Sequence, residues 1–121
     1  MKQVLIVDDS PQVRKRIAAL LNESPQIHIA GEAGSGREAI EAVAKVRPDT
    51  VVLDIRLPDQ NGIALLKQFK ADYPQMTVIM LTNLDDPRYR RVCRSLGADH
   101  FLNKTMDFER IVDTITDKPA H

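Results

Sequence analysis

Several side chains that could do chemistry stand at the ends of short apolar segments. Asp8 and Asp9 follow VLIV, Asp54 follows TVVL, Thr82 closes TVIMLT, and Lys104 comes directly after DHFLN. Each of these residues alone has an ordinary explanation, because aspartate and threonine favour turns and a lysine is usually a solvated cation. Their occurrence at the same place in successive segments favours a shared site.

Neighbouring strands of a parallel sheet lie about 4.8 Å apart, so these segment ends would gather three carboxylates, a hydroxyl and an ammonium into one pocket. Three clustered anions repel one another unless a positive group lies among them. Mg²⁺ is the natural choice, because it takes oxygen ligands, usually one or two carboxylates with waters and a substrate phosphate. The pattern therefore predicts phosphoryl transfer assisted by Mg²⁺.

Asp54 is the expected nucleophile, since carboxylates form aspartyl phosphates in other proteins. It ends the middle strand, between the acidic pair on one side and Thr82 on the other. After it the chain turns through Pro58, Asp59, Asn61 and Gly62.

Hydrophobic patterns predict five strands that alternate with five helices. The strands are expected in residues 3–9, 27–33, 50–54, 77–82 and 99–103. The helices are expected within residues 10–23, after Ser35, and within residues 64–73, 85–97 and 107–116. Such alternation implies right-handed crossovers and a parallel sheet covered on both faces.

Three of the segments, VLIV, TVVL and VIML, are apolar at every position, as strands buried on both faces should be. They are expected at the centre, which gives an α/β fold with the flavodoxin-like strand order 2-1-3-4-5 and a site at the carboxyl ends of the central strands. The whole forms one domain, residues 1–118, with a flexible tail at residues 119–121.

Local signals mark the helix ends. Ser10 is an expected N-cap with Pro11 at the first helical position, and Ser35 is expected to open the second helix. Gly97 is an expected C-terminal stop. In the fourth helix, the expected apolar stripe consists of Tyr89, Val92, Cys93 and Leu96.

The composition limits the classes of partner and of structural site that can be expected. The 121 residues hold 17 basic and 17 acidic side chains, so net charge gives no reason to expect nucleic acid or anionic membrane as a partner. The apolar stretches fall short of a membrane span and the amino end lacks a signal-peptide pattern, so we expect a cytoplasmic protein. The single cysteine, Cys93, excludes an internal disulfide. Together with three scattered histidines it does not supply a ligand set for structural zinc.

The segments VLIVDDS, VVLDIRLPDQNG, VIMLT and SLGADHFLNK together resemble the receiver domain of two-component response regulators, over about residues 2–116. The resemblance implies that Asp54 accepts phosphate from a phosphohistidine on a sensor kinase or phosphotransfer protein, or from a small phosphodonor. It also implies that Asp8, Asp9, Asp54 and the backbone carbonyl of Arg56 hold Mg²⁺.

Further roles follow from the same resemblance. Thr82 would hydrogen-bond one phosphoryl oxygen and Lys104 would pair with another. Phe101 occupies the family's aromatic switch position, although it could equally be an edge-strand core residue. The output would be a downstream effector, an attached domain or a second copy of the chain, reached through the fourth helix, fifth strand and fifth helix.

The sequence departs from the family pattern in two places. The family often has a proline after the lysine, in a cis peptide, whereas Thr105 follows here, which leaves the loop geometry open. Arg56 and Leu84 occupy the two positions that, by the resemblance, tune hydrolysis. The fourth helix also carries Arg88, Arg90, Arg91 and Arg94, which form either a partner surface or an ordinary solvated face.

Three alternatives remain. A haloacid-dehalogenase type phosphatase also forms a strand-end aspartyl phosphate, but it needs a second acid two residues later, where this chain has Arg56. A pseudo-receiver that docks partners without phosphate generally lacks part of the acidic set, which is complete here. Finally, the chain could be a receiver cut from a larger DNA-binding regulator.

Overall fold

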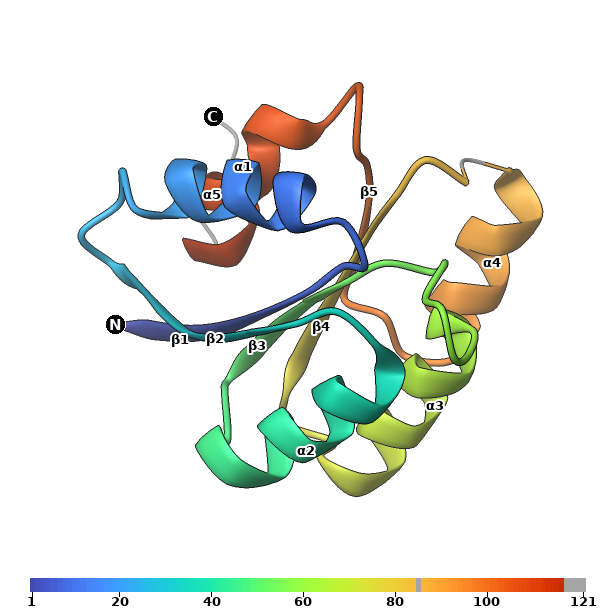
Figure 1. The fold of residues 1–121 in the computed structure, drawn as a ribbon. Coiled ribbons are helices and arrows are strands. Elements are labelled where there is room, and N and C mark those ends of the chain that lie inside the picture. The colour runs from blue at the N-terminus through green and yellow to red at the C-terminus, as the bar shows by residue number, and fades with distance from the viewer. Residues whose placement is uncertain (85, 117–121) are drawn as a thin grey trace.

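A computed structural model describes residues 1–84 and 86–116. Five strands form one parallel sheet in the order β2-β1-β3-β4-β5, as predicted (Figure 1). Their bounds are β1 (Lys2–Val7), β2 (Ile27–Ala33), β3 (Thr50–Leu53), β4 (Thr77–Thr82) and β5 (His100–Asn103). Strands β1, β3 and β4, which carry the segments VLIV, TVVL and VIML, are central, and β2 and β5 lie at the edges.

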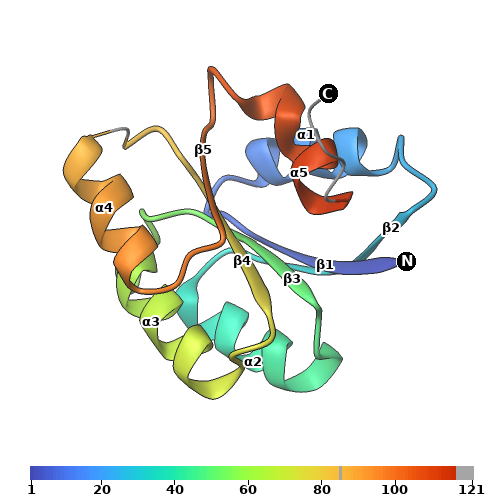
Figure 2. The same cartoon turned by 180° about the vertical axis from the view of Figure 1, so that it is seen from behind.

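Helices cover both faces of the sheet. On one face lie α1 (Pro11–Leu21) and α5 (Ile111–Thr116). On the other lie α2 (Gly36–Val46), α3 (Gly62–Asp72) and α4 (Pro87–Ser95), as the opposite views in Figures 1 and 2 show. All the predicted helices are therefore present in a two-faced α/β arrangement.

Two apolar layers hold this arrangement together. Alternate residues of the central strands point to opposite faces, so Leu5 and Val51 join the layer under α2, α3 and α4. Their neighbours Ile6 and Val52 join the layer under α1 and α5. Because both layers exclude water, the sheet that carries the strand ends is anchored on both sides.

Capping residues fix where the helices begin. The side chain of Ser10 accepts a hydrogen bond from the Val13 amide, and that of Ser35 accepts one from the Glu38 amide, so both predicted N-caps are confirmed. Gly97 has a φ of 99°, a left-handed conformation that favours glycine at the end of a helix.

Three details differ from the sequence-based expectation or fall outside it. Residues 108–110 form a 3₁₀ turn, so the α-helix begins only at Ile111. Val92 is 44% exposed, so it does not belong to the apolar stripe of α4, whereas Cys93 is buried. The tail predicted at residues 119–121 lies outside the described residues.

Within the described ranges, every helix is too short or too polar to cross a membrane.

Candidate functional site

The strand ends align because the backbone pairing of the sheet continues past them. The Asp54 amide donates to Val7 O at 3.1 Å, and the Lys104 amide donates to Thr82 O at 3.1 Å. These bonds place the residues that follow β1, β3, β4 and β5 along one edge of the sheet.

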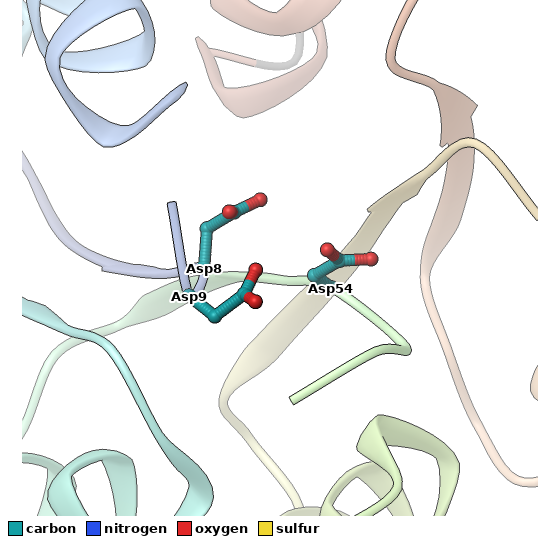
Figure 3. Close-up of side chains that lie close together, drawn as sticks. All are labelled: Asp8, Asp9 and Asp54. Atoms are coloured by element: carbon teal, nitrogen blue, oxygen red, sulfur yellow. The ribbon is translucent and has the colours of Figure 1, made fainter. Parts of the chain in front are cut away.

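Three carboxylates meet at this edge. Asp8 and Asp9 come from the end of β1 and Asp54 from the end of β3, and Figure 3 shows their side chains close together. One carboxylate oxygen from each residue lies within 4.8 Å of the others. Asp8 and Asp54 are 1% and 5% exposed, whereas Asp9 is open to solvent.

Lys104 places its ammonium between two of these carboxylates. Its Nζ lies 2.5 Å from Asp8 Oδ2 and 2.8 Å from Asp54 Oδ2. Burial disfavours the charged ammonium, but its bonds to Asp54 and Asp8 outweigh this effect and raise the pKa of Lys104. The lysine therefore stays charged at neutral pH and offsets part of the negative charge.

Asp8 has a different electrostatic balance. Burial raises the pKa of its carboxyl, and this effect exceeds the opposing ones of Lys104 and the Ser10 amide. The Ser10 amide donates to Asp8 Oδ1 at 2.9 Å. The ionised Asp8 is thus held in place at some cost in stability.

A cavity of about 420 Å³ opens beside these groups. It is lined by Asp9, Asp54, Arg56, Thr82, Asn83, Leu84 and Lys104. Thr82 is 1% exposed, and its Oγ1 accepts a bond from the Leu84 amide at 3.2 Å. The structure therefore brings Asp8, Asp9, Asp54, Thr82 and Lys104 together, with Arg56 and Leu84 on the cavity wall.

The loop after Asp54 is tightly closed. The Gly62 amide donates to Ile55 O at 2.6 Å, and Arg56 pairs with Asn61 across the loop. A side chain at Gly62 would overlap the backbone carbonyl of Asp54. Glycine is needed here because α3 begins directly against the Asp54 backbone.

The loop after β5 is organised by Asn103, which the sequence analysis did not single out. Its Oδ1 accepts bonds from the amides of Thr105 at 2.7 Å and Met106 at 2.9 Å. None of the peptide bonds in residues 1–84 and 86–116 is cis, so the Lys104–Thr105 bond is trans. Asparagine at a strand end is a common turn former, and this signal could have indicated how the loop forms without proline.

Asp59 was expected only to take part in the turn after Asp54. Its carboxylate instead accepts bonds from the Gly36 and Arg37 amides at 2.8 and 2.9 Å, at the start of α2. Hydrogen bonds from the Arg37 and Gly36 amides lower the pKa of Asp59. The loop that follows Asp54 is thereby fastened to α2.

Phe101 lies on β5, beside α4. Its ring is partly buried against the layer under α4. The guanidinium carbon of Arg90 lies 4.7 Å from the ring centroid, and Arg90 Nη1 donates to Phe101 O at 3.3 Å. The aromatic side chain is therefore in contact with the basic helix.

The donor set at the strand ends fits Mg²⁺. All of its side-chain donors are carboxylate oxygens, and the exposed Asp9 leaves one side open for the waters that Mg²⁺ retains. Asp54 Oδ1 meets the Arg56 amide only at 3.4 Å, a weak contact that leaves this oxygen able to bind a cation.

Comparison with known proteins gives a family match over most of the chain. The model of the response regulator receiver domain matches residues 4–116. A chain of the CheX-CheY-BeF3-Mg²⁺ complex from Borrelia burgdorferi superposes with a TM-score of 0.88 and 27% identity, covering 96% of this chain and 87% of that one.

Two curated relatives are longer than this chain. The response regulator protein VraR of Staphylococcus aureus is 33% identical, over 93% of this chain and 54% of its own length. A protein-glutamate methylesterase/protein-glutamine glutaminase of Geobacillus kaustophilus is 33% identical, over 98% of this chain and 36% of its own length. This chain thus spans about half or less of these relatives.

Proposed function

The chain belongs to the response regulator receiver domain family, and we propose that it accepts a phosphoryl group on Asp54 in the presence of Mg²⁺. The observation that carries the proposal is the placement of three carboxylates within 4.8 Å, two of them joined by the Lys104 ammonium. Asp8 and Asp54 are buried, and the single charge of Lys104 compensates only part of the negative charge of three carboxylates, so a further cation would stabilise the cluster.

In the proposed reaction, an oxygen of the Asp54 carboxylate attacks phosphorus. A bond forms between that oxygen and phosphorus while the bond from phosphorus to the donor breaks, and the donor leaves with the electron pair. The transferred group carries negative charge, so catalysis consists mainly of positioning and of compensating charge. No side chain needs to form a second covalent bond.

Each residue of the site has a role in this proposal. Asp8, Asp9, Asp54 and the Arg56 carbonyl would hold Mg²⁺, which when bound compensates the charge of the phosphoryl oxygens. The Thr82 hydroxyl donates to one phosphoryl oxygen. The Lys104 ammonium moves from its bridge between Asp8 and Asp54 to pair with another.

The proposed phosphodonor is a sensor histidine kinase or a phosphotransfer protein, with small phosphodonors as substitutes. The output passes through α4, β5 and α5 to an effector, an attached domain or a second copy of the chain. Contact between Arg90 and Phe101 supports this route, since it joins the basic helix to the strand that leads to Lys104. We also propose that the protein is cytoplasmic and that residues 1–118 form its receiver domain.

We further propose that the chain is a signalling module whose only chemistry is its own phosphorylation and slow dephosphorylation. Support comes from Arg56, which stands where a haloacid-dehalogenase phosphatase needs a second acid. The complete acidic set favours a phosphorylated receiver over a pseudo-receiver.

Phosphorylation is tested by incubating the protein with Mg²⁺ and acetyl phosphate and following the intact mass. We expect one added phosphoryl group on the parent and on the control Asp72→Asn, which changes an exposed carboxylate of α3. Asp54→Asn should remain unlabelled, and chelation of Mg²⁺ should prevent labelling of the parent. Equal labelling of Asp54→Asn would refute the assignment.

A further inference from the structure

Arg14 connects the end of β1 to the neighbouring edge strand. Its Nη1 donates to the backbone carbonyl of Asp8 at 2.6 Å, and its Nε lies 3.2 Å from Glu32 Oε1 on β2. The Arg14 side chain is only 19% exposed, and its guanidinium lies where a side chain at Gly34 would crowd it. One planar group therefore holds both the acidic loop and β2.

The position of Arg14 in α1 indicates that its contacts do more than stabilise the helix. It lies in the first turns of α1, where its amide donates to Ser10 O at 3.0 Å. A cation near a helix N-terminus opposes the helix dipole, so the local electrostatics are unfavourable. The charge also lies beside a site that is expected to take a divalent cation.

We propose that Arg14 is a positioning residue for the metal site, fixing the Asp8 carbonyl so that the Asp8 and Asp9 carboxylates are set for Mg²⁺. This inference rests on the proposed function. The Ser10 amide, which donates to Asp8 Oδ1, reports on that arrangement, because its bond requires the same orientation of Asp8. Residues behind a metal ligand commonly change affinity about 10–100-fold when altered.

Charge and positioning predict opposite effects of substitution. If Arg14 acted only through its charge, Arg14→Gln would tighten Mg²⁺ binding by removing repulsion, and Arg14→Lys would leave it unchanged. If Arg14 positions the loop, both variants weaken binding, since lysine lacks the planar fork that reaches Asp8 O and Glu32 together. The sign of the change therefore separates the two roles.

The experiment titrates the full chain with Mg²⁺ alone, using amide NMR shifts, and measures exchange of the Ser10 amide without metal. The variants are Arg14→Gln, Arg14→Lys and the milder Glu32→Gln. The matched control is Arg37→Gln, which removes another Arg–Glu contact, with Nε 3.3 Å from Glu41 Oε1, on the exposed surface of α2.

We expect both Arg14 variants to raise the Kd for Mg²⁺ about tenfold and to speed Ser10 exchange, with a smaller change in Glu32→Gln and none in Arg37→Gln. With acetyl phosphate, the Mg²⁺ concentration for half-maximal labelling should rise while the maximal rate is kept. Unchanged or tighter binding in Arg14→Gln, or parental behaviour of Arg14→Lys, would overturn the inference. Absence of Mg²⁺ binding by the parent would instead refute the proposed function. Exchange of the Ser10 amide would then still show whether Arg14 orders the Asp8 loop.

Discussion

Asp8 carries the least exposed carboxylate of the candidate site, and its pKa gives a test of the charge balance there. Because burial raises this pKa above 3.8, the folded protein binds the proton more tightly than the unfolded chain does. The stabilising contribution is fully present below pH 3.8 and is lost as the pH rises through the folded-state pKa. Ionised Asp8 therefore lowers stability at neutral pH.

We predict that Asp8→Asn raises the Tm of the metal-free protein at neutral pH, by a few degrees, while Lys104 keeps its bond to Asp54. The difference from the parent should shrink as the pH is lowered through the raised pKa of the parent carboxyl, because that carboxyl then takes up its proton. Thermal melts with chelator across this pH range measure both effects. A lower Tm for Asp8→Asn at neutral pH would mean that the ion pair with Lys104 outweighs the cost of burial.

Arg56 and Leu84 line the cavity beside Asp54, and neither side chain can accept a proton from a water that attacks the phosphoryl group. We predict slow dephosphorylation for this reason. Arg56→Asn and Leu84→Glu should each lose phosphate faster, by about tenfold, and the double variant faster still, because a polar side chain can orient the water. Decay of the phosphorylated protein, followed by mass after removal of the donor, gives the rates.

The control for this comparison is Arg37→Asn, which removes an exposed arginine of α2 and should decay like the parent. The opposite role for Arg56 is stabilisation of the transition state, as an arginine finger provides. Slower decay in Arg56→Asn would establish that role.

At the scale of elements, much of the structure could be predicted because local and long-range signals agree. The strands VLIV, TVVL and VIML are apolar throughout, which placed them centrally, and Ser10 and Ser35 marked helix starts. The same logic predicts that Asp8, Asp9 and Asp54 meet at one edge of the sheet, and one carboxylate oxygen from each lies within 4.8 Å of the others.

The remaining features could not be predicted, because they depend on contacts between segments that are distant in the sequence or on which of two local backbone structures forms. Arg14 looks like any helical arginine until β2 brings Glu32 beside it. Val92 follows the helical period but lies outside the contact with the sheet. At the start of the last helix, Asp107 donates its amide to Asn103 O, and a 3₁₀ turn precedes the α-helix.

Helix α4 and strand β5 form the pair of elements most suited to respond to phosphate. Thr82 Oγ1 accepts a bond from the Leu84 amide, and a new bond from its hydroxyl to phosphate would favour a different placement of this segment. We predict changed amide hydrogen exchange over residues 82–102 on phosphorylation, through the contact of Phe101 with Arg90. Helix α2 serves as the internal reference, and unchanged protection across 82–102 would leave no switch there.

At the scale of the whole molecule, the candidate metal site connects β1 and β3, two strands whose side chains enter both apolar layers. Asp8 and Asp9 extend β1, Asp54 extends β3, and each of these strands contributes to both layers. A cation held between them would bind the native state and not the unfolded chain, in which the carboxylates are separated. Its binding energy would then add to global stability rather than only to local order.

We therefore predict that Mg²⁺ raises the Tm of the parent protein over its value in chelator. Mg²⁺ at 100 times its Kd contributes about 2.7 kcal/mol, which for a domain of this size corresponds to roughly 10 °C. Asp9→Ala removes an exposed carboxylate of the site and its repulsion, so it should fold and melt at or slightly above the parent in chelator but lose the rise with Mg²⁺. Asp72→Asn, which alters an exposed acid of α3, should keep the rise. If Mg²⁺ left the Tm of the parent unchanged, or stabilised Asp9→Ala equally, the acidic cluster would not be a metal site that supports the fold.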